Sequence, residues 1–139
     1  MSSTNPVPRF AADLRSRAQA CLEKFVTENT GIKLAVLTSA DGFEVAAHPS
    51  RPMTQKIAAM SSSLQALSEA IAREAGLANS RNLVIESENG TIVVLGLATT
   101  VPRMSLAVVG AGDEILGRLL WLARQCGNEL DSSILKSQI

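Results

Sequence analysis

The sequence predicts an α/β domain with a chiefly antiparallel sheet and the element order α-β-β-α-β-β-β-α. Two observations carry this prediction. Apolar residues recur at helical spacing in three separate segments. The turn dipeptides Asp41-Gly42 and Asn89-Gly90 each stand between short aliphatic runs, which is typical of hairpins. Because hairpins make neighbouring strands antiparallel, the helix between them must cross from one part of the sheet to the other.

The first helix is expected from about Phe10 to Glu28, where apolar residues recur every three or four positions with charged residues between them. Gly31 then interrupts the pattern. Strands are predicted at Lys33–Thr38 and Phe43–Ala47. Between them, Asp41-Gly42 supplies the left-handed backbone of a tight turn.

The second helix is expected from about Met53 to Ala75, with Gly76 as its stop. Strands are predicted at Arg81–Glu88 and Thr91–Leu97. Asn89-Gly90 should join them, because this dipeptide readily takes positive φ at both turn positions.

A fifth strand is expected at Met104–Val109, followed by a helix at Asp113–Cys126. The domain should therefore occupy residues 10–127. We expect a flexible N-terminus at residues 1–9 and leave residues 128–139 as a C-terminal tail without assigned structure.

Composition excludes several functions. The chain has 139 residues, a formal net charge of zero and a pI near 6.6, so it lacks the basic surface that nucleic acid requires. Three Phe, one Trp and no Tyr leave little material for base stacking. No apolar run approaches the roughly 20 residues of a membrane span, and the polar N-terminus is unlike a signal peptide. We expect a cytoplasmic protein that does not insert into membranes.

Few residues are suited to catalysis. The single histidine, His48, lies beside Pro49 without an acidic or nucleophilic neighbour, and we interpret it as a solvated loop residue. Cys21 and Cys126 stand far apart in apolar helical stretches and are interpreted as packing thiols. The sequence therefore predicts no enzyme, no metal site and no cofactor.

A glycine pair before the last helix is similar to the start of a dinucleotide site. Gly110 and Gly112 follow a strand, but Ile115 stands where the third glycine of that fingerprint belongs. Only 24 residues follow Ile115, too few for a second strand with a ribose-binding acid. We interpret the pair as a tight strand-to-helix turn. Since the phosphate-loop pattern is absent, the chain should not hydrolyse nucleotides itself.

Two stripes on the central helix are candidate interface residues. The first has the alternating spacing of helix-on-helix packing and consists of Ile57, Met60, Leu64, Leu67 and Ile71. The second has small side chains that permit close approach and consists of Ala59, Ser63, Ala66 and Ala70. One stripe can pack on the chain's own sheet while the other meets a second copy. The alternative is that both are buried within the chain.

Trp121 does not fit the apolar pattern of the last helix. By helical periodicity it falls opposite the apolar side and near arginines, as an interface anchor would. The alternative is that the tail residues Leu130, Ile134 and Leu135 fold back and cover the Trp121 side chain.

The segment Ala-Val-Leu-Thr-Ser-Ala-Asp-Gly-Phe-Glu-Val, residues 35–45, resembles the strand, Asp-Gly turn and strand of roadblock/dynein-light-chain domains. Residues 53–76 look like the long central helix of that family, and residues 82–97 like its central hairpin. Residues 104–126 look like its last strand and helix. The resemblance covers about Ala11 to Gly127 and is closest to the prokaryotic small-GTPase-regulator branch.

The resemblance implies a five-stranded antiparallel sheet with the long central helix on one face and the terminal helices on the other. It also implies a homodimer in which the central helices pair and the strands at residues 81–88 join edge to edge. This pairing adds Val84 and Glu86 to the candidate dimer interface.

Family members act as non-enzymatic regulators or scaffolds of Ras-like small GTPases, or as light chains in motor complexes. The resemblance therefore implies a partner GTPase whose switch segments dock on the dimer. The candidate partner-binding residues are Arg51, Arg73, Arg81 and Trp121. Two alternatives remain open: a structural, light-chain-like adaptor without nucleotide dependence, and a small-ligand sensor, which would need polar groups converging in the core.

Overall fold

The computed structural model describes residues 12–98, 100 and 103–137, and the expected flexible segment 1–9 lies outside them. The described elements follow the predicted order: α1 (Ala12–Glu28), β1 (Ile32–Thr38), β2 (Glu44–His48), α2 (Pro52–Glu74), β3 (Asn82–Ser87), β4 (Gly90–Gly96), β5 (Ser105–Ala111) and α3 (Leu116–Ser137).

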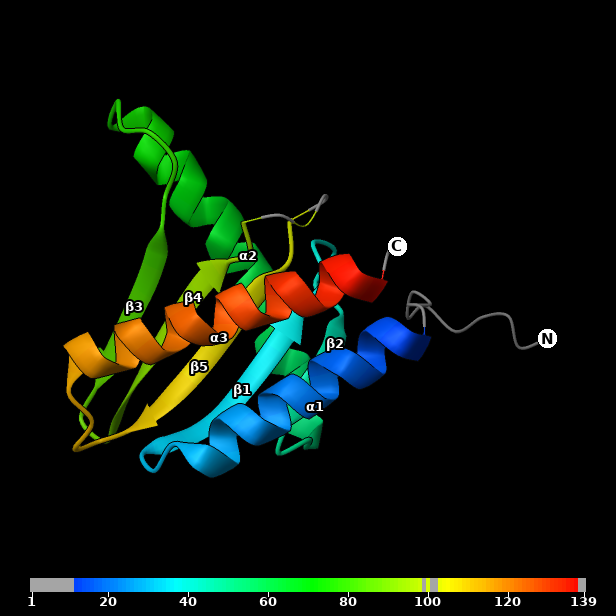
Figure 1. Ribbon diagram of the computed structural model, residues 1–139. Helices are drawn as coiled ribbons and strands as arrows, with labels where there is room; N and C mark the ends of the chain where they lie inside the picture. The colour runs from blue at the N-terminus through cyan, green and yellow to red at the C-terminus, as the bar shows by residue number, and fades with distance from the viewer. Residues whose placement is uncertain (1–11, 99, 101–102, 138–139) are drawn as a thin grey trace.

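The five strands form one sheet in the order β2-β1-β5-β4-β3, and every neighbouring pair is antiparallel. Helices α1 and α3 contact each other and cover one face, while α2 lies on the other (Figure 1). The predicted fold class is thus confirmed. The sheet leaves β2 and β3 as its two edge strands.

The larger core lies between the sheet and the α1–α3 layer. Alternate residues of the central strands enter it, including Leu37, Leu106 and Val93, and meet Leu22 of α1 and Leu119 of α3. A much smaller cluster lies under α2 and consists of Leu34, Val36, Ala47 and Ala58. Most of the apolar burial therefore holds α1 and α3 in place, and α2 is bound to the sheet by fewer apolar contacts.

Helix α3 differs from its predicted range. It begins at Leu116 rather than Asp113, and it continues to Ser137 instead of ending at Cys126. Leu130 and Ile134 extend its apolar side and are fully buried in the larger core. Gly127, where the domain was expected to end, lies inside the helix against Leu95 of the sheet. The small residue there permits close contact between the helix and the sheet.

The hairpin between β3 and β4 has a different turn from the predicted one. No residue other than glycine has positive φ among the described residues, and Gly90 has none either. Ser87 pairs with Gly90, so the two loop residues are Glu88 and Asn89. A Cβ on Gly90 would lie 2.9 Å from the carbonyl oxygen of Gly110. The glycine is thus needed for close strand approach.

Helix α2 ends at its predicted stop. Gly76 has φ of 76°, and its N–H donates to the carbonyl of Arg73 at 3.0 Å. The N–H of Leu77 donates to the carbonyl of Ala72 at 2.8 Å, which completes a Schellman motif.

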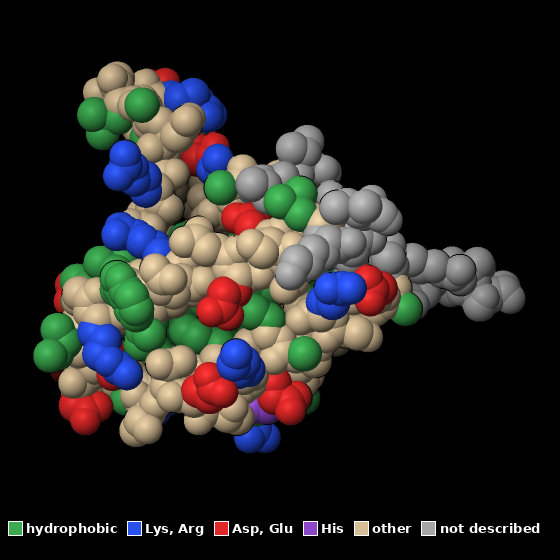
Figure 2. Space-filling model, in the orientation of Figure 1, with side chains coloured by type: hydrophobic (Ala, Val, Ile, Leu, Met, Phe, Trp, Pro, Cys, Tyr) green, Lys and Arg blue, Asp and Glu red, His purple; other side chains and the backbone are tan. Residues whose placement is uncertain are grey.

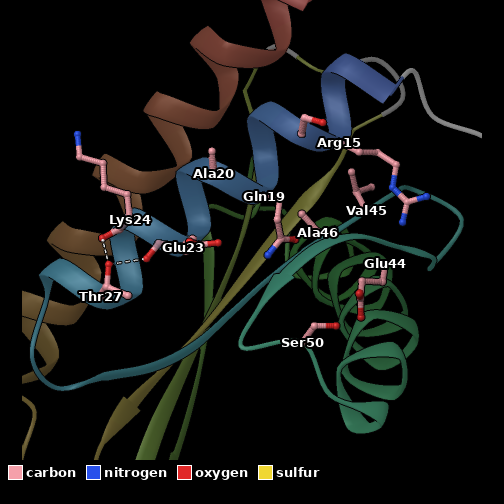
Figure 3. A pocket seen from close by; sticks show the side chains of 11 residues that line it. Arg15, Gln19, Ala20, Glu23, Lys24, Thr27, Glu44, Val45, Ala46 and Ser50 are labelled. Carbon is pink, nitrogen blue, oxygen red and sulfur yellow. Dashed lines mark hydrogen bonds between the residues drawn. The ribbon is translucent and has the colours of Figure 1, made fainter.

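Gln19 of α1 covers part of the edge of β2. Its side-chain amide nitrogen donates to the carbonyl of Ala47 at 2.7 Å, and its oxygen accepts from the N–H of Ala47 at 3.2 Å. Figure 3 shows this side chain reaching from α1 toward β2, within a cleft of about 810 Å³. The amide thereby takes the place that a neighbouring strand would occupy.

Replacing Gln19 with alanine should lower the free energy of unfolding by about 1 to 2 kcal/mol, because it leaves the N–H and carbonyl of Ala47 without this partner. Urea denaturation would measure the loss. Gln125→Ala, on the exposed surface of α3, is the control and should change stability by less than about 0.5 kcal/mol. Equal effects of the two substitutions would contradict the edge role of Gln19.

The two cysteines meet between α1 and α3, and both are free thiols. A hydrogen bond between them lowers the pKa of Cys21, while the same hydrogen bond and burial raise the pKa of Cys126. Cys126 belongs to the larger core and Cys21 lies at its border, so both pack as apolar side chains. Within the described residues, no helix has the length and apolar character needed to cross a membrane.

Candidate functional site

The side of α2 that faces the sheet is not the one predicted from its apolar pattern. Its buried residues are Thr54, Ala58, Ser61 and Gln65, which recur at helical spacing. The Thr54 hydroxyl donates to the Glu44 carboxylate of β2 and fixes the start of the helix on the sheet. Small and polar side chains thus attach α2 to its own domain. Of the predicted apolar stripe, Ile57 packs against the small cluster under the helix.

The predicted apolar stripe of α2 points mainly away from the chain. Met60 and Leu67 are each 57% exposed and Ile71 is 61% exposed, while Ile57 and Leu64 are half-buried because they lie nearest the sheet side of the helix. Exposure of several large apolar side chains on one helix face is typical of interaction surfaces. We call Ile57, Met60, Leu64, Leu67 and Ile71 the seam.

The stripe of small residues is exposed as well. Ala59, Ser63 and Ala66 face solvent, and Ala70 is half-buried. Neither stripe packs on the chain's own sheet along its whole length, which contradicts the expectation that one of them would. Most residues of both stripes are exposed, which contradicts the alternative that both are buried within the chain. Two adjacent faces of the helix remain open to another molecule.

The C-terminal part of α2 projects beyond the sheet, as Figures 1 and 2 show. A helix of 23 residues is about 35 Å long, whereas a strand of seven residues spans about 23 Å. No residue from 66 to 81 is buried. The second half of the seam therefore lies where the chain's own sheet cannot cover it.

Edge strand β3 adds apolar side chains on both faces of the sheet. Ile85 pairs with Ile92, so it lies on the side of α2, and Val84 pairs with the core residue Val93 on the opposite side. Val84 and Ile85 are both partly exposed, and Glu86 faces solvent beside Val84. The candidate interface omitted Ile85, although strand alternation places it on the α2 side.

The candidate arginines do not converge on one site. Arg51 precedes the first turn of α2 and Arg73 lies in its last turn, about 33 Å away at the helical rise per residue. Arg81 lines a different pocket, beside Arg124 and Asp131 of α3. His48, expected in a solvated connection, is instead half-buried as the last residue of β2.

Trp121 is 61% exposed, so the alternative in which the tail covers it is wrong. Leu130 and Ile134 face the core because the segment is helical, and Leu135 is itself exposed. Figure 2 shows hydrophobic side chains over the start of α3, where Ile115 is also exposed. This second apolar surface lies on the face of α1 and α3, away from the seam.

A family model described as "Roadblock/LC7 domain" matches residues 19–109, which include α2 and most of the sheet. No curated protein matches the sequence.

Solved structures similar to this chain include MglB of Myxococcus xanthus, with a TM-score of 0.77 and 15% identity over 96% of this chain and 97% of that one. Gliding protein MglB of Thermus thermophilus has a TM-score of 0.75 and 21% identity over 94% and 97%. A Roadblock/LC7 domain of Streptomyces avermitilis has a TM-score of 0.65 and 20% identity over 86% and 93%. At these identities the likeness concerns the fold.

Proposed function

The chain belongs to the Roadblock/LC7 domain family, and on this basis we propose that it is a cytoplasmic, non-enzymatic regulator that binds a Ras-like small GTPase as a homodimer. The observation that carries the proposal is the exposed seam of α2. Its large apolar side chains face away from the domain that they would otherwise stabilise.

Two features that a second copy can satisfy together support the homodimer. Pairing of two seams removes Met60, Leu67 and Ile71 from water. Strand β3 stands at the sheet edge and can pair with β3 of the second copy, which supplies partners for its outer backbone groups. A two-fold axis between the copies satisfies both contacts, because each copy contributes the same surface.

Regulation requires only that the dimer bind one nucleotide state of the GTPase more tightly than the other. The switch segments of such GTPases differ in conformation between the two states, and a surface that fits one of them shifts the population toward it. The exposed faces of α2 and the apolar surface around Trp121 are the candidate docking surfaces. Arg51 and Arg73 supply positive charge at the two ends of α2, and Arg81 supplies it beside Arg124 of α3.

Retention of a Ras-like small GTPase of the same organism on the immobilised chain tests the proposal. We expect about tenfold stronger retention of either the GDP form or the form with a non-hydrolysable GTP analogue. The rate of nucleotide hydrolysis or release should change in parallel. Absence of binding in both states would contradict the proposal, and equal binding in both states would assign a structural adaptor instead.

A further inference from the structure

The two cysteines of the chain lie together between α1 and α3. These helices contact each other on one face of the sheet (Figure 1). Cys21 belongs to α1 and Cys126 to α3, and the Cys126 thiol donates a hydrogen bond to the sulfur of Cys21. Folding therefore brings two free thiols from opposite ends of the domain into contact.

A second contact places Cys21 on the same face of α3. The Cys21 sulfur lies 3.9 Å from a carboxylate oxygen of Glu129. Glu129 follows Cys126 by three positions, so these two residues are neighbours on one face of the helix. Ala18 and Ala123, each three positions before a cysteine, are fully buried, and such short side chains allow close packing of helices. The thiol pair is thus held by the packing of two helices.

The two thiols differ in their access to solvent. Cys126 is 1% exposed and belongs to the larger core. Cys21 is half-buried and lines an open hollow of about 560 Å³ between α1 and α3. Arg17 and Lys24 of α1 and Glu129 of α3 also line this hollow. A small molecule from solvent can therefore reach Cys21, while the core closes off Cys126.

The surroundings favour the thiolate form of Cys21. The hydrogen bond from Cys126 lowers the pKa of Cys21, and so does the charge of Lys24, whereas burial and Glu129 act in the opposite direction. The resulting pKa is lowered. The same hydrogen bond and burial raise the pKa of Cys126. Because the thiolate is the reactive form, Cys21 is suited to attack an oxidant while Cys126 stays protonated beside it.

We propose that Cys21 and Cys126 form a peroxide-sensitive modification site, in which Cys21 is oxidised first and Cys126 then converts it to a disulfide. Such a site needs a reactive, accessible thiol next to a second cysteine, and both are present here.

The reaction balances with hydrogen peroxide as the oxidant. The Cys21 thiolate attacks one peroxide oxygen, the O–O bond breaks, and the released hydroxide takes up the proton that Cys21 has lost and becomes water. Cys21 is then a sulfenic acid. The Cys126 sulfur attacks the Cys21 sulfur, the S–O bond breaks, and the departing hydroxide takes the Cys126 proton and leaves as a second water. Two thiols and one peroxide thus give one disulfide and two waters.

The disulfide would join α1 to α3 covalently. Sulfur atoms that already contact each other need only a small further approach to form the bond. The seam belongs to α2 on the opposite face of the sheet (Figure 1). The modification site therefore requires neither the homodimer nor the GTPase, and either proposal can fail without the other.

Treatment of the folded, reduced full chain with hydrogen peroxide tests this site. We expect the intact mass to fall by two hydrogens, a single-chain band on a denaturing non-reducing gel, and a peptide map that links Cys21 to Cys126. Dithiothreitol should restore both thiols. The oxidised chain should have a Tm higher by about 5 to 15 °C, because the bond restricts the unfolded chain.

Two single-cysteine variants separate the roles of the thiols. Cys126→Ala should stop at the Cys21 sulfenic acid, which dimedone traps. Cys21→Ala should leave a Cys126 that reacts with peroxide at least about tenfold more slowly than Cys21 does, because this thiol is buried and protonated. In urea the two variants should react equally fast, which is the control that the difference comes from the fold.

Four results would overturn the proposal. One is an unchanged mass of the wild-type chain after peroxide treatment. Another is a disulfide that joins two chains rather than Cys21 to Cys126. The third is equal peroxide reactivity of the two folded variants. The fourth is a Tm that oxidation does not raise, because the bond would then strain the two helices.

Discussion

Replacing Leu130 with alanine is expected to lower the free energy of unfolding by about 3 kcal/mol. The side chain is fully buried in the core between α3 and the sheet, and removal of buried methyl groups leaves a cavity that the surroundings fill only in part. Folded domains typically have a free energy of unfolding of about 5 to 15 kcal/mol, so this loss is a large fraction of the total. Urea denaturation followed by circular dichroism would measure it.

Leu135→Ala is the matched control, because it is the same substitution in the same helix at an exposed position. It should change stability by less than about 0.5 kcal/mol. A loss below about 1 kcal/mol for Leu130→Ala would show that the residues after Gly127 contribute little to the stability of the fold. A large difference between the two leucines would establish the last turns of α3 as part of the folded unit.

Leu67→Glu is expected to weaken the homodimer at least about a hundredfold, which corresponds to about 3 kcal/mol. Leu67 is 57% exposed in the single chain, so the charged variant should keep the fold of each copy. In the proposed dimer the carboxylate would be buried between two apolar helix faces without a partner, at a cost of several kcal/mol. Light scattering over a range of concentrations would detect the change from dimer to monomer.

Leu135→Glu is the control for added charge, since it lies on an exposed face of α3 rather than on the seam. It should leave the dimer intact, and circular dichroism should show both variants folded. A wild-type chain that is monomeric at every concentration would refute the dimer, as would a Leu67→Glu chain that still dimerises. Leu67 is a sharper probe than Leu64, because Leu64 is half-buried within its own chain.

Element order and fold class could be predicted because their signals are local. Helical periodicity, the turn at Gly42 and the stop at Gly76 depend on residues close in sequence. The turn before Gly90 and the continuation of the last helix through Gly127 were not predicted, for the opposite reason. The neighbours of these glycines in space, the carbonyl of Gly110 and the side chain of Leu95, come from other elements.

The candidate sites could likewise be predicted only where the signal lies in residues close in sequence. Helical periodicity identified the seam. An apolar stripe predicts that a helix face is in contact with something, but it does not tell whether that is the chain's own sheet or another molecule. Only the structure reveals that Ala58 and Gln65 hold α2 on the sheet, which leaves the seam free.

The Gln19 side chain bears on how many copies of the chain could join in one continuous sheet. Copies joined through β3 would share one continuous sheet whose two outer ends are both β2. At each end the amide of Gln19 already occupies Ala47, and β2 is only five residues long. A strand from a third molecule would have to displace this amide first, so the sheet of the proposed dimer would not extend beyond two copies and fibres would be disfavoured.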